Sequence, residues 1–223
     1  MVNYLKFQSH TKSLLDWYDC NARELPWRMP PHLVRSGQSP NPYHVWLSEI
    51  MLQQTTVKSV IPYFLKFISR WSNVFSLCNA KDEEIMEAWA GLGYYTRARN
   101  LIDCAKVLVN KYDGVFPNNE KQLLTLPGVG AYTASAICSI AFEKRAAVVD
   151  GNIERVISRL FLIREPIKAS KKKIRNYAEL LTPNNRFGDY CQAMMDLGAT
   201  ICTPKKPKCS SCPIKRNCLG YKE

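Results

Sequence analysis

The stretch from Leu126 to Asp150 constrains the fold of this chain more than any other. Pro127, Gly128 and Gly130 mark a tight turn between two helical runs, because glycine tolerates positive φ and proline ends the run before it. The first N–H groups of the following helix lack intrahelical partners and lie at its positive dipole end. This hairpin therefore predicts an anion site, for which a DNA phosphate is suited. Asp150 follows as the expected start of the next helix.

A Gly-x-Gly turn on its own is more often an ordinary helix connection, so the remaining sequence has to decide. Lys and Arg number 31 against 19 Asp and Glu, which gives a net charge of +12 and a pI near 9.3. This excess indicates a polyanion or an anionic membrane surface as partner. The membrane is the weaker alternative, because no apolar run approaches the ~20 residues that span a bilayer. Residues 1–10 also lack the layout of a secretory signal, so we expect a soluble, intracellular protein. We also expect a monomer.

Four of the nine cysteines crowd into the last stretch in the pattern C-x6-C-x2-C-x5-C: Cys202, Cys209, Cys212 and Cys218. In a chain without a secretory signal, such a set favours a metal site over disulfides. Four thiolates hold zinc or an iron–sulfur cluster, and the ligand count does not separate the two. Zinc ribbons usually carry two C-x2-C pairs across a longer spacer, whereas only one short pair is present here. Basic residues between the cysteines predict a cationic surface for phosphates: Lys205, Lys206, Lys208, Lys215 and Arg216.

Apolar residues recur with helical periodicity along the chain, and no pair of alternating strands flanks a hairpin turn. The sequence therefore predicts an all-α fold. The expected helices are 5–17, 43–54, 56–71, 82–89, 98–112, 132–142, 153–161, 168–181 and 187–201, with a proline-rich loop at 29–42.

Glu49 is the acidic residue in the apolar run VWLSEIMLQQT. Val45 and Leu52 share its helix face, so we expect the side chain to be partly buried. Burial helps a carboxyl group to hold a proton near neutrality, as a general acid requires. On this stretch alone, a surface glutamate on an ordinary helix is the simpler interpretation.

Longer strings identify a family. LPGVGAYTA and VVDGN resemble the helix-hairpin-helix and Gly/Pro-Asp loop of the endonuclease III superfamily of DNA glycosylases. Together with LPWR, WLSEIMLQQT, GLGYYTRARNL and QAMMDLGATIC, they resemble MutY-type adenine DNA glycosylases over most of the 223 residues. The resemblance implies a six-helix barrel domain at 29–144 and a cluster domain at 1–28 and 145–223, with a [4Fe-4S] loop at 202–218.

The resemblance also implies a role for each matched residue. Glu49 is expected as the general acid and Asp150 as the essential aspartate, with Tyr132 and Asn152 in the catalytic set. The four cysteines are expected to bind the [4Fe-4S] cluster. The expected DNA-contacting residues are Gln54, Tyr94, Leu126, Gly128, Gly130, Arg28 and Asp196. Asp196 is one methylene shorter than the glutamate of many members.

Tyr132 separates two chemistries within the resembled superfamily. Members that also cut the strand carry a lysine at this position, whose amine forms a Schiff base with the sugar. A tyrosine has no such amine, although it is equally well explained as an aromatic residue that packs at a helix start. We therefore expect a monofunctional glycosylase.

The resemblance implies a base excision repair enzyme that acts on double-stranded DNA in the cytoplasm, associated with the nucleoid. It is expected to flip adenine out from opposite 8-oxoguanine or guanine and to hydrolyse the N-glycosidic bond. Two alternatives stay open: a thymine glycosylase that acts on T·G mismatches, and a non-catalytic mismatch-binding module. Many MutY proteins continue beyond the cluster into a domain that reads 8-oxoguanine, which this sequence does not include. Either a truncation or a natural short form explains this, and strict dependence on 8-oxoguanine stays open.

Overall fold

The computed structural model describes residues 4–223, with side chains from His10 onward. The described residues form helices and connecting loops without a strand, which confirms the all-α prediction. They divide into two compact units. The first unit comprises the described residues up to Arg23, Pro30–Gly37 and Glu143–Glu223, and the second comprises Glu24–Met29 and Gln38–Phe142. The expected domain division stays a prediction. The two units differ from it near the N-terminus, because residues 30–37 belong to the first unit and residues 24–28 to the second.

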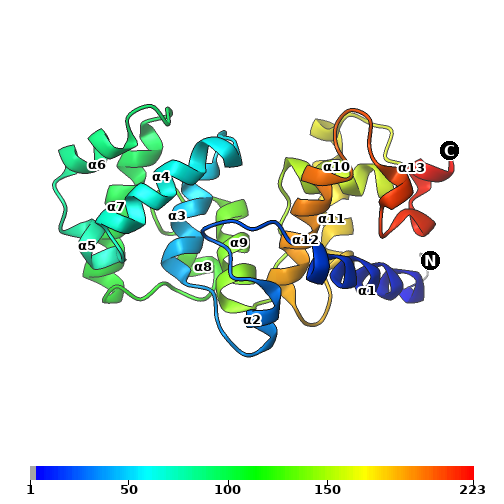
Figure 1. Ribbon diagram of the computed structural model, residues 1–223, viewed down its shortest axis with the longest axis horizontal. Helices are drawn as coiled ribbons and strands as arrows, with labels where there is room; N and C mark the ends of the chain where they lie inside the picture. Colours follow the sequence, from blue (N-terminus) through cyan, green and yellow to red (C-terminus); the bar gives the residue numbers. More distant parts are fainter. Residues whose placement is uncertain (1–3) are drawn as a thin grey trace. The chain divides into compact units, whose positions relative to one another are not determined.

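The second unit is built around a buried central helix, α3 (Figure 1). In chain order its helices are α3 (Pro42–Leu52), α4 (Val57–Arg70), α5 (Val74–Cys78), α6 (Asp82–Trp89), α7 (Thr96–Tyr112), α8 (Glu120–Leu123) and α9 (Ala131–Phe142). α3 packs against α4, α7 and α9, and its Trp46, Leu47 and Met51 side chains have no exposed surface. Burying each large apolar side chain contributes about 1.5–3 kcal/mol, so this helix is the core of the unit.

Capping side chains set where these helices begin. Asn41 accepts a hydrogen bond from the N–H of Tyr43 at 2.9 Å, and Thr56 accepts one from the N–H of Ser59 at 3.2 Å. Each cap satisfies an N–H group that lacks an intrahelical partner. The observed helix starts therefore lie within one or two residues of the expected ones.

The first unit packs four helices, α1, α10, α11 and α12, around a second core. Its elements are α1 (Tyr4–Asn21), α2 (Pro31–Arg35), α10 (Gly151–Leu160), α11 (Ile167–Leu181), α12 (Phe187–Thr200), two 3-10 turns at Cys209–Ser211 and Lys215–Asn217, and α13 (Leu219–Lys222). α10 contacts α11, α12 and α13, while α1 packs along α12 (Figure 1). Ile157, Ile174 and Leu197 are fully buried where these helices meet.

Several short elements were not expected, among them α2, α5 and α13. The proline-rich loop contains the short helix α2, because Pro31 occupies the first helical position, where its missing N–H costs nothing. Helix α5 was not expected. It begins at a capping box in which Asn73 and Ser76 bond each other's backbone N–H groups, a signal that the apolar periodicity does not carry.

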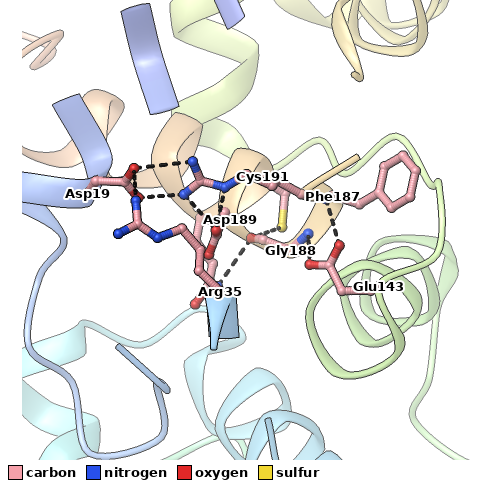
Figure 2. Close-up of polar contacts among 9 residues, drawn as sticks. Asp19, Arg35, Glu143, Phe187, Gly188, Asp189 and Cys191 are labelled. Carbon is pink, nitrogen blue, oxygen red and sulfur yellow. Dashed lines mark hydrogen bonds and ion pairs between the residues drawn. The ribbon is translucent and has the colours of Figure 1, made fainter. Parts of the chain in front are cut away.

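An ion-pair network fixes the start of α12 (Figure 2). Arg186 donates to Asp19 of α1 at 2.5 Å and to Asp189 at 2.8 Å, and Arg35 of α2 donates to Asp19 at 2.7 Å. The Glu143 carboxylate accepts hydrogen bonds from the first N–H groups of α12, those of Phe187 and Gly188, at 3.0 Å each. The network therefore joins α1, α2 and the segment before Asp150 to one helix end.

Among the described residues, no helix is both long and apolar enough to span a membrane.

Candidate active site and cysteine loop

Glu49 lies on α3 with only 6% of its surface exposed, as its apolar helical neighbours predicted. The adjoining helix α9 buries hydroxyl side chains rather than apolar ones at several positions: Thr133, Ser135 and Ser139. The Glu49 carboxyl group is therefore largely shielded from bulk water.

In the second unit, two residues with exposed side chains have a left-handed backbone conformation. Gln54 lies just after α3 with φ 56°, and Tyr94 lies just before α7 with φ 49°. Tyr94 is 59% exposed. Both residues are in the left-handed region, which non-glycine residues rarely adopt. Gln54 and Tyr94, which the resemblance implied as DNA-contacting residues, are therefore both accessible.

The hairpin has the tight geometry that its glycines predicted. Gly128 has φ 73°, and a Cβ added there would lie 2.8 Å from Cβ of Asn100, so only glycine fits. The N–H of Val129 bonds the carbonyl of Leu126 at 3.1 Å and closes the turn. Leu126 is 3% exposed, so its side chain anchors the hairpin in the core. Gly130 is exposed, and a Cβ added to it would meet no atom within 4 Å, which leaves space for a ligand before α9.

Tyr132 lies in the first turn of α9, directly after the hairpin, and is half-buried. Arg28 is also half-buried, in the Glu24–Met29 segment of the same unit. The second unit thus carries Glu49, both exposed turns and the hairpin, together with Tyr132 and Arg28.

Asp150 belongs to the first unit, where it caps α10. Its Oδ1 accepts the N–H of Ile153 at 2.7 Å, and its Oδ2 accepts a hydrogen bond from Nδ2 of Asn152 at 2.9 Å. The expected N-cap is confirmed. These two donors hold the carboxylate in one orientation at the positive end of the helix.

Arginines that the sequence did not single out connect this cap to the cysteine loop. Arg155 donates to Oδ1 of Asn152 at 2.9 Å and to the carbonyl of Cys202 at 2.8 Å. One turn further along α10, Arg159 donates to the Cys202 sulfur at 3.4 Å and to the carbonyl of Thr203 at 2.7 Å. The start of the loop is thus fixed to the helix that Asp150 caps.

Asp196 lies on α12 with a fully buried side chain. Its carboxylate forms an ion pair with Nε of Arg23 at 2.6 Å and accepts the backbone N–H of the same residue at 3.0 Å. A role in DNA contact stays a prediction. Its burial favours a structural role, because a fully buried carboxylate bonded twice within its own unit has no surface to offer a base.

The four loop cysteines are half-buried, and three of them, Cys202, Cys212 and Cys218, pack against the core of the first unit. Burial raises the pKa of the Cys212 thiol to about 11, and the charges of the Cys202, Cys209 and Cys218 sulfurs add to this rise. Binding of a metal group must therefore displace thiol protons.

The arrangement of these sulfurs tests which group they fit. No set of three or more His, Cys, Asp or Glu side chains among the described residues is arranged to hold a metal ion. A single zinc ion about 2.3 Å from each thiolate needs sulfurs within about 4 Å of one another. An iron–sulfur cubane binds each thiolate through a different iron and requires a wider spacing. The Arg159 guanidinium beside Cys202 would offset part of the negative charge that four thiolates bring to either group.

Residues 47–183, which include Glu49, the hairpin and Asp150, match the family model of the HhH-GPD superfamily of base excision DNA repair proteins. The chain belongs to this superfamily.

Curated HhH-GPD relatives include adenine DNA glycosylases from bacteria and mammals. The Buchnera aphidicola (subsp. Baizongia pistaciae) protein is 42% identical over 211 residues, which cover 94% of this chain and 58% of the relative. The Homo sapiens protein is 43% identical over 209 residues, which cover 92% of this chain and 38% of the relative. The chain thus spans little more than half the length of the bacterial relative.

Two solved structures confirm the expected fold. A thermostable thymine-DNA glycosylase superposes with a TM-score of 0.83 at 32% identity, with 98% of this chain and 97% of that chain covered. A non-covalent endonuclease III–DNA complex superposes with a TM-score of 0.75 at 23% identity, covering 100% of this chain and 98% of that chain. The latter likeness concerns the fold alone.

Proposed function

We propose that this HhH-GPD protein is a monofunctional DNA glycosylase that removes adenine mispaired with 8-oxoguanine or guanine. The observation that carries the proposal is the burial of Glu49 at 6% exposure inside the string that resembles the adenine glycosylase active-site helix. Curated relatives from Buchnera to human, at 42–43% identity over at least 92% of this chain, support adenine as the target.

In this proposal Glu49 and Asp150 divide the chemistry. Glu49 donates its proton to N7 of the adenine, which makes the base a better leaving group. The Asp150 carboxylate, oriented by Asn152 and the start of α10, stabilises the positive charge that develops on the sugar as the bond breaks. Water then completes the hydrolysis.

The DNA contacts follow from exposure and backbone geometry. The hairpin from Leu126 to Gly130 binds a phosphate through backbone N–H groups at the start of α9. Gln54 and Tyr94 enter the base stack as the adenine leaves it. The enzyme acts as a monomer on double-stranded DNA, and extrusion of a mispaired base costs less than that of a paired one.

Cys202, Cys209, Cys212 and Cys218 would hold a [4Fe-4S] cluster, and Arg159 would donate to its Cys202 ligand. When bound, the cluster acts as a rigid, charged cross-link for the loop. The loop lysines, such as Lys205 and Lys208, then face DNA phosphates from a fixed backbone.

Thymine excision from T·G mismatches is the second candidate. It is favoured by the thermostable thymine-DNA glycosylase, which matches this chain over 97% of its own length with a TM-score of 0.83. Adenine remains the first choice because the adenine glycosylase relatives have higher identity, 42–43% against 32%.

The test is chromatography of the free base released from duplexes that carry A·8-oxoguanine, A·G or T·G pairs. The proposal predicts free adenine from the first two duplexes, no free thymine, and no strand break until alkali is added. Release of neither base by the iron-loaded protein would leave only the mismatch-binding alternative.

A further inference from the structure

Two of the turns assigned to DNA contact in the proposed function have the same kind of backbone strain. Gln54 (φ 56°) and Tyr94 (φ 49°) both occupy the left-handed region, although neither is glycine. Such conformations cost free energy and persist only where the surroundings over-determine them. Each turn must therefore be held by the contacts around it.

The same side chain bonds the backbone immediately before each strained residue. On the α3 side, Nη1 of Arg97 donates to the carbonyl of Gln53 at 2.6 Å, and on the other side Nη2 donates to the carbonyl of Gly93 at 3.1 Å. Nη1 also donates to the carbonyls of Ile50 at 3.2 Å and Met51 at 2.6 Å, and Nη2 also donates to the carbonyl of Leu92 at 3.2 Å. One guanidinium thus spans the two turns.

Arg97 is a buried residue that is hydrogen-bonded to the backbone, not a surface cation. Its side chain belongs to a residue that is 7% exposed, and within the described part of the chain its hydrogen bonds all go to backbone carbonyls. The last carbonyls of α3 carry the negative end of the helix dipole, which stabilises a cation there. The guanidinium carbon also lies 5.3 Å from the ring centres of Trp89 and Tyr94.

Gln53 extends the same connection to the hairpin. While its carbonyl accepts from Arg97, its side-chain Nε2 lies 3.4 Å from both the carbonyl of Gly128 and Oγ1 of Thr133. The turn after α3, the turn before α7 and the hairpin are therefore connected through Arg97 and Gln53, which are hydrogen-bonded to each other.

We propose that Arg97 is a positioning residue that holds the Gln54 and Tyr94 turns in a fixed mutual arrangement, ready to enter DNA. The inference rests on the proposed function of these two side chains as wedges. With both turns held before DNA arrives, binding does not have to order them, so less of the interaction free energy is lost. Lysine cannot replace the fork, because a single ammonium lacks its planar, divergent donors.

The test measures DNA distortion separately from base release. A duplex with 2-aminopurine beside an A·8-oxoguanine pair reports unstacking by fluorescence when saturated with protein. The iron-loaded wild type should raise the fluorescence, and Arg97→Lys should lose most of that rise. Arg97→Lys should also slow single-turnover adenine release by roughly ten- to a hundredfold, as misplacement of positioned groups does. Arg70→Met, which removes an exposed arginine stacked on Trp71, is the control for lost charge.

A double-mutant cycle separates positioning from general stability. In a background of Gln54→Ala with Tyr94→Ala, Arg97→Lys should cause no further loss of fluorescence or rate, because there is no wedge left to position. A further, additive loss would overturn the proposal. It would also be overturned if Arg97→Lys, with both wedge residues intact, raised the fluorescence as much as the wild type does. The cycle is then repeated with Arg97→Met, which removes the charge. This variant must show the same helical circular dichroism as the wild type.

These outcomes are distinct from failure of the proposed function. A wild type that unstacks the duplex but releases no base contradicts the glycosylase assignment and leaves the Arg97 cycle interpretable. A wild type that releases adenine while Arg97→Lys distorts DNA normally contradicts only the role of Arg97.

Discussion

Asn152 donates a hydrogen bond from Nδ2 to Oδ2 of Asp150 at 2.9 Å, which leaves Oδ1 to cap α10 through the N–H of Ile153 at 2.7 Å. The same carboxylate is therefore a helix cap and a candidate electrostatic catalyst. Substitution can separate the two roles, because asparagine and aspartate cap helices about equally well.

Asp150→Asn should keep the fold and lose the activity. The amide oxygen still accepts from Ile153 and only the hydrogen bond from Asn152 is lost, so thermal stability should change less than in Asp150→Ala, which also loses about 1 kcal/mol with the cap. Both variants should release adenine at least ~10²-fold more slowly, because no negative charge faces the sugar cation. Melting curves and single-turnover rates measure the two effects. Normal turnover by Asp150→Asn would reduce this residue to a cap.

Glu49→Gln should bind a mispaired duplex nearly as well as the wild type but release almost no adenine. The amide preserves the shape of the buried side chain and has no acidic proton, and loss of general acid catalysis costs ~10²–10⁴ in rate. Gel-shift binding and base release are measured on the same preparation. Glu84→Gln, on the first turn of α6, is the matched control and should behave as wild type. Retained turnover in Glu49→Gln would show that the proton comes from another group.

Tyr132→Lys should gain the ability to capture the sugar. The residue lies in the first turn of α9, directly after the hairpin, and lysine there offers the amine that strand-cutting members of the superfamily use. The variant should form a borohydride-trapped complex with DNA, and the wild type should form none. Good trapping by the wild type would contradict monofunctional chemistry, and an inert variant that still releases adenine would place Tyr132 in a packing role.

Cys209→Ser should yield protein with little iron and weak DNA binding. Without four thiolates the loop is no longer cross-linked, and its lysines lose their fixed positions. Iron analysis, visible absorbance and binding measured over a salt series test this. Cys20→Ser, which alters an exposed cysteine outside the loop, should keep the iron and the affinity. Zinc without iron in wild-type protein purified without oxygen would refute the cluster.

His44 should make the protein acid-sensitive. Burial lowers the pKa of its imidazole below the ordinary value of 6.5, so the unfolded chain binds the proton more tightly. The stability it contributes is fully present above about pH 6.5 and is lost as the pH falls through the lowered pKa. His44→Phe keeps the ring contact with Phe64, which has a centroid distance of 5.6 Å. Its melting temperature should therefore fall less than that of wild type between pH 7.5 and 5.5; an equal fall contradicts the prediction.

Local sequence patterns predicted the features that depend on near neighbours. The burial of Glu49 followed from Val45 and Leu52, and the cap of Asp150 followed from its place before a helix. Positive φ at Gly128 followed from the hairpin string. Each of these signals lies within a few residues of the side chain concerned.

Features that depend on distant contacts left no such signal. Arg97 bonds carbonyls 44 to 47 positions earlier in the chain, and Arg155 bonds a carbonyl 47 positions later. In the sequence both are ordinary helical arginines on a basic protein. The buried ion pair of Asp196 with Arg23, 173 positions away, was equally invisible to periodicity. Tertiary packing alone gave these residues their roles.

The central claim is most directly tested by a competition in one reaction. Equal amounts of two duplexes, identical except for an A·8-oxoguanine or a T·G pair, are incubated with iron-loaded protein, and the released free bases are quantified over time. Adenine should appear at a rate at least ~10-fold above thymine, and Glu49→Gln should abolish its release. Preferential release of thymine, or adenine release that survives Glu49→Gln, would contradict the account.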